Sequence, residues 1–362
     1  MLFYKSGLLL ALSIAGANAF SCQDQNGKDV DWFASYKMPK IDGDNSVPGI
    51  SDGHAFYYLD SNNPALTPSP NSLSSNNQAI ALTLKQYYDR KDDSLVAHVM
   101  YNDEIPDGVT ARYTLMEKLR QFRQRFATEF GHTKGVVFFD GKSGVWLVHS
   151  VPKFPMPDSY SYPDSGTNYG QSFLCMTFDG SQLAAIGTQL LFNHPQIYSS
   201  KLPTAMVSGN PDLASLIGGN YNKGAPYTST KVLKTKAGAQ FTSFAKNGDF
   251  GKDLYDGLVA PGIKTALDVE TWRRGKESAL DCSTAYEIAD ILTLQVGSSP
   301  VFKYTKDHSK LAISSQITSP YVCIGDINRM TTQYERGGGT ICFKNQFVWN
   351  SYSKIPQSTK HC

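Results

Sequence analysis

The chain has 362 residues, which is enough for two domains or for one large domain with a substantial core. Its charged fraction of 18% and hydrophobic fraction of 41% are ordinary for a folded protein and exclude a disordered one. The net charge of +2 excludes the strong basic excess of many nucleic-acid-binding domains, although protonation of the seven histidines in an acidic compartment would attract polyanions.

The N-terminus has the three parts of a secretory signal peptide. Lys5 precedes an apolar run at 8–14, and small residues follow at 17–19. We therefore expect residues 1–19 to be removed and the mature chain to begin near Phe20. The apolar run is too short to span a bilayer, and no later stretch approaches the required length, so we expect no membrane insertion.

Further along the chain, strand and helix patterns alternate. Residues 29–38 are typical of a buried strand, and the Ser-, Asn- and Pro-rich stretch at 60–78 is typical of an exposed loop. Residues 111–130 predict a helix with one apolar face and one basic face, which we interpret as solvated. A stretch rich in Pro, Gly and Asn at 191–227 indicates a junction between two halves. The pattern predicts a mixed α/β architecture with two related lobes.

A His-x-Lys pattern occurs once in each half, at His132 and Lys134 and again at His308 and Lys310. In a strand, side chains two residues apart share a face, so each histidine and lysine can point toward one phosphate. A single copy of so short a pattern is more often a solvated strand edge than a site. Two copies in matching contexts favour a shared function.

Each copy precedes a predicted β-hairpin. The first hairpin turns at 140–144, and we expect it to bring Lys134 opposite Ser150 and His149 beside His132.

The second hairpin has strands at 311–314 and 321–325 and a turn at 315–320. It is expected to bring Asp326 and Asn328 near His308.

Two histidines and two lysines at one phosphate permit two kinds of cleavage. In one, a first histidine attacks phosphorus and a second protonates the leaving oxygen, giving a phosphohistidine that water hydrolyses. The lysines would stabilise the charge on the phosphate oxygens, so no divalent metal is required. In the other, the histidines cleave RNA by acid-base catalysis through its 2'-hydroxyl, without a covalent intermediate. The residue types alone leave both open.

Six cysteines remain after removal of the predicted signal peptide, and an even number in a secreted chain predicts disulfides. Six cysteines allow fifteen pairings, among which the sequence alone does not choose. The chain contains no Cys-x-x-Cys pair or His-Glu-x-x-His motif, so we predict no metal site and no cofactor. It also has no Asn-x-Ser/Thr sequon.

Many ordered segments along nearly the whole mature chain resemble the deoxyribonucleases of type II, a family of acid nucleases in the phospholipase D-like superfamily. These segments are VDWFASYKMP (30–39), GHTKGVVFFD (131–140), VWLVHSVPKFP (145–155), NYGQSFLC (168–175), AKNGDFGKDLY (245–255), DHSK (307–310) and CIGDINRMTTQYERGGGTIC (323–342). The resemblance implies a pseudo-dimer of two phospholipase D-like lobes, each a mixed β-sheet flanked by helices. We assign the two lobes to residues 20–205 and 206–362. The resemblance also implies metal-independent endonucleolytic cleavage of DNA at acid pH, leaving 3'-phosphate and 5'-hydroxyl ends.

The resemblance assigns roles to several residues. His132, Lys134, His308 and Lys310 would be catalytic, with the identity of the nucleophile left open. His149 and Asn328 would bind substrate or support the catalytic residues, whereas Asp140 is interpreted as a turn residue and Asp326 as structural. The cysteines would pair as Cys22 with Cys175, Cys282 with Cys362, and Cys323 with Cys342.

The expected partner is DNA, degraded from engulfed, apoptotic or ingested cells, and no homo-oligomer is predicted. Family members commonly carry N-linked glycans that assist lysosomal delivery, and this chain has no acceptor for one. We therefore expect a protein of the secretory pathway, in the lysosome or outside the cell. Two alternatives are a phospholipase D-like lipid hydrolase and an inactive secreted relative that binds nucleic acid or acts as a toxin. The intact set of two histidines and two lysines argues against the loss of activity.

Overall fold

The computed structural model describes residues 19–110 and 130–362. The predicted signal peptide and the predicted helix at 111–130 fall almost entirely outside these ranges. Among the described residues, no helix is both long and apolar enough to cross a membrane.

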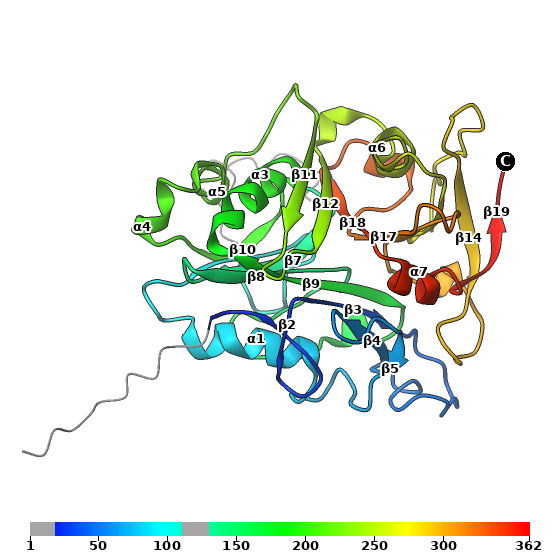
Figure 1. The fold of residues 1–362 in the computed structure, drawn as a ribbon, viewed down its shortest axis with the longest axis horizontal. Helices are drawn as coiled ribbons and strands as arrows, with labels where there is room; N and C mark the ends of the chain where they lie inside the picture. Colours follow the sequence, from blue (N-terminus) through cyan, green and yellow to red (C-terminus); the bar gives the residue numbers. More distant parts are fainter. Residues whose placement is uncertain (1–18, 111–129) are drawn as a thin grey trace, which may run out of the picture.

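Two large β-sheets form the body of the protein (Figure 1). The first sheet has, in spatial order, β10 (Ile197–Lys201), β6 (Ala97–Asn102), β7 (Lys134–Phe139), β8 (Ser143–His149), β9 (Gln171–Asp179), β3 (Trp32–Lys37), β4 (Phe56–Asp60) and β5 (Thr67–Pro68). The second has β11 (Thr228–Lys234), β12 (Gln240–Lys246), β18 (Gly338–Lys344), β17 (Tyr321–Gly325), β16 (Leu311–Ser314), β13 (Leu267–Glu270), β14 (Ile288–Leu294) and β15 (Phe302–Lys303), and β19 (Pro356–Lys360) also pairs with β14. Among these pairs only β13 and β14 run parallel.

A few helices and one small ribbon complete the described fold. The helices are α1 (Ala79–Arg90), α3 (Leu183–Asn193), α4 (Thr204–Val207), α5 (Pro211–Ile217), α6 (Ala260–Ile263) and α7 (Gln346–Tyr352), and the ribbon pairs β1 (Cys22–Gln23) with β2 (Asp29–Val30). Helix α1 begins where the Gln78 side chain accepts hydrogen bonds from the backbone N–H groups of Ile80 and Ala81. This cap satisfies two of the N–H groups that a helix start leaves without partners.

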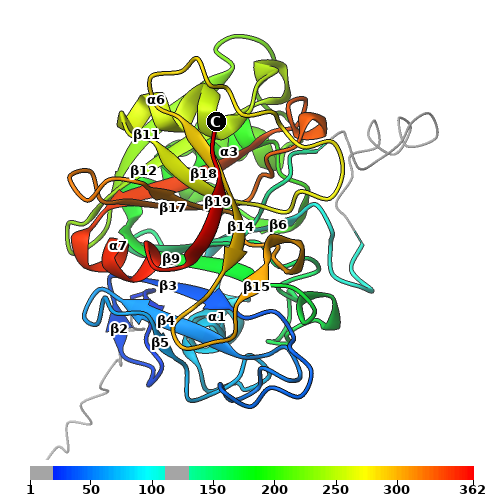
Figure 2. The ribbon, with the colours of Figure 1, turned by 90° about the vertical axis from the view of Figure 1, so that its right-hand side faces the viewer.

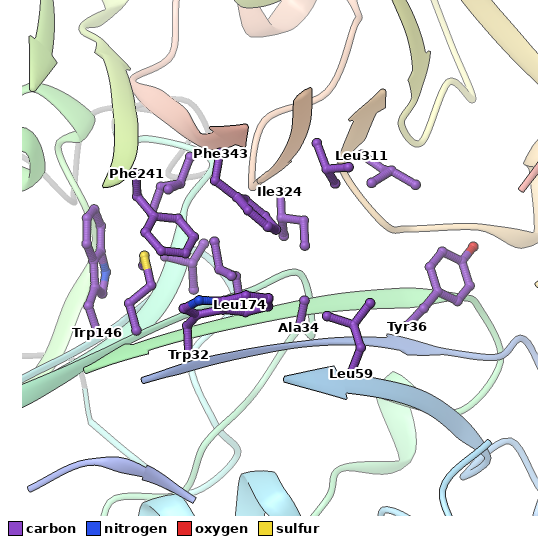
Figure 3. Close-up of a cluster of buried hydrophobic side chains, with 14 of the residues drawn as sticks. Trp32, Ala34, Tyr36, Leu59, Trp146, Leu174, Phe241, Leu311, Ile324 and Phe343 are labelled. Carbon is purple, nitrogen blue, oxygen red and sulfur yellow. The ribbon is translucent and has the colours of Figure 1, made fainter. Parts of the chain in front are cut away.

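The two sheets pack face to face, as Figures 1 and 2 show from two sides. Trp32 of the first sheet packs against Phe241 and Phe343 of the second, with ring centroids 6.2 and 5.4 Å away (Figure 3). Each buried side chain of this size contributes roughly 1.5–3 kcal/mol relative to exposure. This apolar layer therefore holds the two halves, and the residues at their border, in one fixed arrangement.

The same strand arrangement occurs in both sheets. Strands β6, β7, β8, β9 and β3 of the first sheet correspond in spatial order to β13, β16, β17, β18 and β12 of the second. Along the chain, each set begins with the strand that is last in this spatial order, β3 in the first sheet and β12 in the second. The other four strands of each set then follow in their spatial order. The structure thus confirms the predicted mixed α/β fold of two sheet-based lobes.

Both predicted hairpins are present, as β7–β8 and β16–β17. Asp140 is a turn residue as predicted, because its carboxylate accepts the backbone N–H groups of Lys142 and Ser143. The predicted register of the first hairpin is wrong by one residue. Gly135 pairs with Val148, so the position opposite Lys134 is that of His149 rather than that of Ser150.

The predicted buried strand at 29–38 is confirmed by β2 and β3. The first sheet ends along the chain at Lys201 and the second begins at Thr228, with the assigned division at 205/206 between them. Helix α3 precedes this division but packs against β11 and β12 of the second sheet. The division itself stays a prediction.

All three cysteine pairs that the resemblance implied are present: Cys22–Cys175, Cys282–Cys362 and Cys323–Cys342. Cys323 and Cys342 stand directly opposite each other in β17 and β18. This bridge therefore closes the loop between the second hairpin and the glycine-rich segment.

Candidate active site

A cavity of about 370 Å³ contains both His-x-Lys pairs. Its lining comes from both lobes and consists of Asp103, Glu104, His132, Lys134, Ser150, Pro152, Trp272, His308, Lys310, Asn328 and Arg336. The structure therefore brings together the four residues predicted to be catalytic, along with Asn328. It also adds an acidic residue, an arginine and a tryptophan to the site.

The imidazole of His132 is held by side chains of the other lobe. Its Nδ1 atom lies 2.7 Å from Oε1 of Gln333, an acceptor, and from this contact we assign the proton to Nδ1. Nδ2 of Asn328 lies 3.5 Å from the same nitrogen. In the neutral ring, Nε2 then has a free lone pair, and Asp103 Oδ2 lies 3.7 Å from it. This tautomer suits attack on phosphorus or acceptance of a proton.

Asp103 is the centre of an ion cluster beside His132. Its carboxylate contacts Nζ of Lys134 and lies 3.1 Å from Nη2 of Arg336. Burial raises the pKa of Asp103, but the charge of Lys134, with further contributions from His132 and Arg336, lowers it more, so the pKa lies well below its usual range. Asp103 stays ionised even in acid and balances part of the positive charge in the cavity.

The imidazole of His308 is enclosed by aromatic rings. Tyr169 stacks on it with ring centroids 4.4 Å apart and planes within 7°, and Trp272 meets it edge-on at 3.9 Å. Nε2 of His308 has no hydrogen-bond partner among the described residues. Lys310 Nζ donates to the backbone carbonyl of His308, and burial followed by the charge of Lys134 lowers the pKa of this lysine to about 7.

Both candidate catalytic histidines have lowered pKa values. Burial is the largest cause of the lowered pKa of His132; the Asp103 carboxylate opposes it, and the charges of Lys134 and Arg336 add to it. Burial also lowers the pKa of His308, and the charge of Lys310 is the next cause. A phosphodiester entering the cavity would add negative charge and favour protonation.

Two buried contacts join the lobes next to the cavity. Thr133 donates to the carboxylate of Asp326, which also accepts the backbone N–H of Gly339. Tyr36 of the first lobe donates to Asp307, which precedes His308. Asp326 thus holds the second lobe against the segment that carries His132, which agrees with its predicted structural role.

Equivalent loops from the two lobes support the two histidines. Buried Lys37, at the end of β3, donates to the carbonyls of Thr167 and Tyr169 in the loop before β9. Buried Lys246, at the end of the equivalent strand β12, donates to the carbonyls of Gln333, Tyr334 and Arg336 in the loop before β18. Each loop then presents one side chain to the histidine of the opposite lobe: Tyr169 to His308, and Gln333 to His132.

His149 does not line the cavity. It is fully buried, packs against Phe154 and Phe173, and its Nδ1 atom accepts the backbone N–H of Val151. Burial lowers its pKa to about 3, with a smaller contribution from Lys134. The structure therefore places it behind the site, and its support of the catalytic residues stays a prediction.

Sequence reasoning missed Asp103, Gln333, Arg336, Trp272 and Tyr169. A signal existed for Asp103, because it directly follows a strand, β6, in which Asn102 pairs with Lys134. The other four lie in loops that reach the site only through the packing of the two lobes.

Comparison with known proteins agrees with the geometry. A family model described as Deoxyribonuclease II matches residues 21–362. The chain belongs to the deoxyribonuclease II family.

Similar proteins match over nearly their full length. A deoxyribonuclease-2 of Caenorhabditis elegans is 55% identical over 358 residues, covering 96% of this chain and 95% of that protein. Plancitoxin-1 of Acanthaster planci is 38% identical, with coverages of 97% and 94%. Deoxyribonuclease-2-alpha of Mus musculus is 36% identical, with coverages of 99% and 98%. The chain is accordingly a DNA-hydrolysing nuclease of the deoxyribonuclease II family, within the phospholipase D-like superfamily.

Proposed function

We propose that this nuclease is an acid endodeoxyribonuclease that needs no metal and acts through a phosphohistidine, leaving 3'-phosphate and 5'-hydroxyl ends. The observation that carries the proposal is the single cavity lined by His132 and Lys134 from one lobe and by His308 and Lys310 from the other. An in-line displacement needs a nucleophile and a proton donor on opposite sides of one phosphorus, and two histidines from two lobes supply such a pair.

In the first step, a lone pair of one imidazole attacks phosphorus and the bond from phosphorus to the 5'-oxygen breaks. The other histidine, in its protonated form, donates its proton to that oxygen, which leaves as a 5'-hydroxyl. The 3'-phosphoryl end of the DNA is then bonded to the first histidine. Gln333 supports this step because it fixes the tautomer of His132.

In the second step, the other histidine, now neutral, takes a proton from a water molecule that attacks phosphorus. The nitrogen–phosphorus bond breaks and its electron pair returns to the first histidine. The products are a 3'-phosphate end and the free enzyme. Lys134, Lys310 and Arg336 line the cavity and stabilise the negative charge on the phosphate oxygens. This is the role that a divalent metal has in metal-dependent nucleases.

The lowered pKa values of both histidines explain the proposed acid optimum. One histidine has to be protonated before the first step, and burial together with the neighbouring cations opposes that proton. A lower pH populates the protonated form, and the bound phosphate favours it further. An acidic compartment of the secretory pathway, such as the lysosome, or an acidic extracellular fluid therefore suits the site, with DNA from engulfed, apoptotic or ingested cells as the substrate.

The test is cleavage of supercoiled plasmid at pH 5 and pH 7.5, with and without EDTA. We expect nicking and linearisation at pH 5 that survive EDTA, and product ends that terminal transferase extends only after phosphatase treatment. His132→Ala and His308→Ala should each abolish cleavage while keeping the wild-type circular dichroism spectrum. His361→Ala is the matched control, because this histidine is exposed near the C-terminus and lies outside the cavity.

Three results would contradict the proposal. Cleavage that requires magnesium would exclude the metal-independent mechanism. A near-normal rate in either histidine variant would exclude its catalytic role. Cleavage of RNA but not of DNA would favour attack by the 2'-hydroxyl and exclude the phosphohistidine route.

A further inference from the structure

We propose that Trp272 and Arg274, beside His308, form a stacking subsite for one unpaired base next to the scissile phosphate. This inference rests on the proposed function, because it assigns a substrate group to a surface of the same cavity. It adds a preference for DNA in which that base has left the helical stack. We call Tyr169, Trp272 and Arg274 the aromatic ledge.

The ledge is a set of planar groups in mutual contact. The rings of Tyr169 and Trp272 are 4.8 Å apart at 65°, and both contact the imidazole of His308. The guanidinium of Arg274 lies over the Trp272 ring, 4.7 Å from its centroid, and is 5.9 Å from that of Tyr169. Planar aromatic and guanidinium groups are those on which bases stack in proteins that bind single-stranded nucleic acids.

The ledge is held in place from both lobes. Trp272 and Arg274 follow strand β13, while Tyr169 precedes strand β9 of the other lobe. Gly170 N donates to the carbonyl of Lys306 at 2.9 Å, and His308 N donates to the carbonyl of Gly170 at 2.8 Å. Together with the bond from Lys37 to the Tyr169 carbonyl, these contacts fix the ledge relative to the catalytic histidine.

A substrate group can reach this surface. Trp272 itself lines the cavity and is only partly buried, and Arg274 is exposed. Arg274 donates to the carbonyl of Thr305 at 3.2 Å, which orients its planar group over the indole. A phosphodiester held by Lys134 and Lys310 has a nucleoside on either side, and the proposal places one of the two bases on the ledge.

A packing role for His308 alone would explain Tyr169 but not Arg274. Tyr169 stacks on the imidazole with its plane parallel, and this contact is sufficient to restrain the ring. Arg274 lies over the Trp272 ring and extends the planar surface outward from it. A cation on an aromatic face beside a phosphate site matches a nucleotide in both charge and shape.

The experiment uses single-stranded oligonucleotides with one cleavable phosphodiester among methylphosphonate linkages. The nucleoside on one side of that bond carries either a base or an abasic tetrahydrofuran, and both sides are tested. The kcat/KM is measured at pH 5 for wild type, Trp272→Ala and Trp272→Phe. Binding of an uncleavable all-methylphosphonate analogue of each oligonucleotide is measured by fluorescence anisotropy.

For wild type, removal of the base on one side should lower kcat/KM and affinity by about tenfold. Trp272→Ala should lower kcat/KM and affinity by a similar factor on the base-bearing oligonucleotide. On the abasic oligonucleotide, it should match wild type in both quantities. Trp272→Phe should retain most of the base dependence. The equality of the two losses is the signature of direct stacking, because the two changes remove the same contact.

Two outcomes would overturn the inference. One is a wild-type enzyme that cleaves and binds base-bearing and abasic oligonucleotides equally on both sides. The other is a Trp272→Ala variant that loses the same factor on every substrate, which would mean that the indole only packs His308. Either result leaves the proposed nuclease function intact. Absence of cleavage of any DNA contradicts the proposed function, whereas base-dependent binding that needs Trp272 would still support the ledge.

Discussion

Gln333 and His132 belong to different lobes, yet Oε1 of Gln333 lies 2.7 Å from Nδ1 of His132. The Gln333 backbone is itself held, because its carbonyl accepts from buried Lys246. The equivalent lysine, Lys37, holds the loop that presents Tyr169 to His308. Each histidine is thus oriented by the opposite lobe, so the active site exists only where the two sheets are packed together.

Gln333→Leu should lower kcat about tenfold, because it removes an oriented hydrogen bond worth about 1 to 1.5 kcal/mol. Gln333→Glu tests the same contact through pH. A carboxylate beside Nδ1 favours the protonated ring and should move the pH limb that belongs to His132 toward higher pH. A shift of the acid limb would identify His132 as the group that must be neutral, and a shift of the alkaline limb would identify it as the proton donor. A pH–rate profile of kcat that matches wild type in both variants would contradict the positioning role.

The sequence predicted the parts of the site that are local in the chain. The second hairpin has its predicted bounds, because its apolar strands and its turn residues are adjacent in the sequence. The predicted register of the first hairpin was wrong by one residue. Strand β8 begins at Ser143 rather than at Val145, and the length of the turn sets the register. Gln333 and Trp272 were missed because loop residues reach a site only through tertiary packing.

The loop closed by Cys323–Cys342 carries Asn328, Gln333 and Arg336, which all contact or line the His132 side of the cavity. Replacing both cysteines by alanine should cost about 3 kcal/mol of unfolding free energy, since the pairing spans 19 residues. It should also lower kcat several-fold at temperatures where the protein stays folded. Thermal unfolding and plasmid cleavage measure the two effects.

The exposed bridge Cys282–Cys362 provides the matched control. It spans 80 residues, so the same chain-entropy argument gives a larger stability loss of about 4.5 kcal/mol on its removal. Neither of its cysteines lines the cavity, and we expect kcat to stay near wild type. Removal of Cys282–Cys362 should therefore cost more stability, whereas removal of Cys323–Cys342 should cost more activity. Equal activity in the two double variants would mean that the Cys323–Cys342 bridge has no role in holding the site.

His149→Asn should make the protein more resistant to acid. Burial lowers the folded-state pKa of His149 to about 3, whereas an unfolded histidine titrates near its ordinary value of about 6.5. Between these values the unfolded chain binds the proton and the folded chain does not, so His149 lowers the unfolding free energy as pH falls below about 6.5. From pH 7 to pH 5 this loss is about 2 kcal/mol. Asparagine does not titrate, and its side chain can still accept from the N–H of Val151, two residues on.

The variant should therefore gain about 2 kcal/mol relative to wild type between pH 7 and pH 5, measured by urea unfolding at each pH. The difference between the two pH values is the readout, because a change in packing alone shifts stability equally at both. If the wild-type and His149→Asn stability curves run parallel from pH 7 to pH 5, then His149 takes up its proton in the folded protein. Its burial behind the cavity would in that case not keep it neutral.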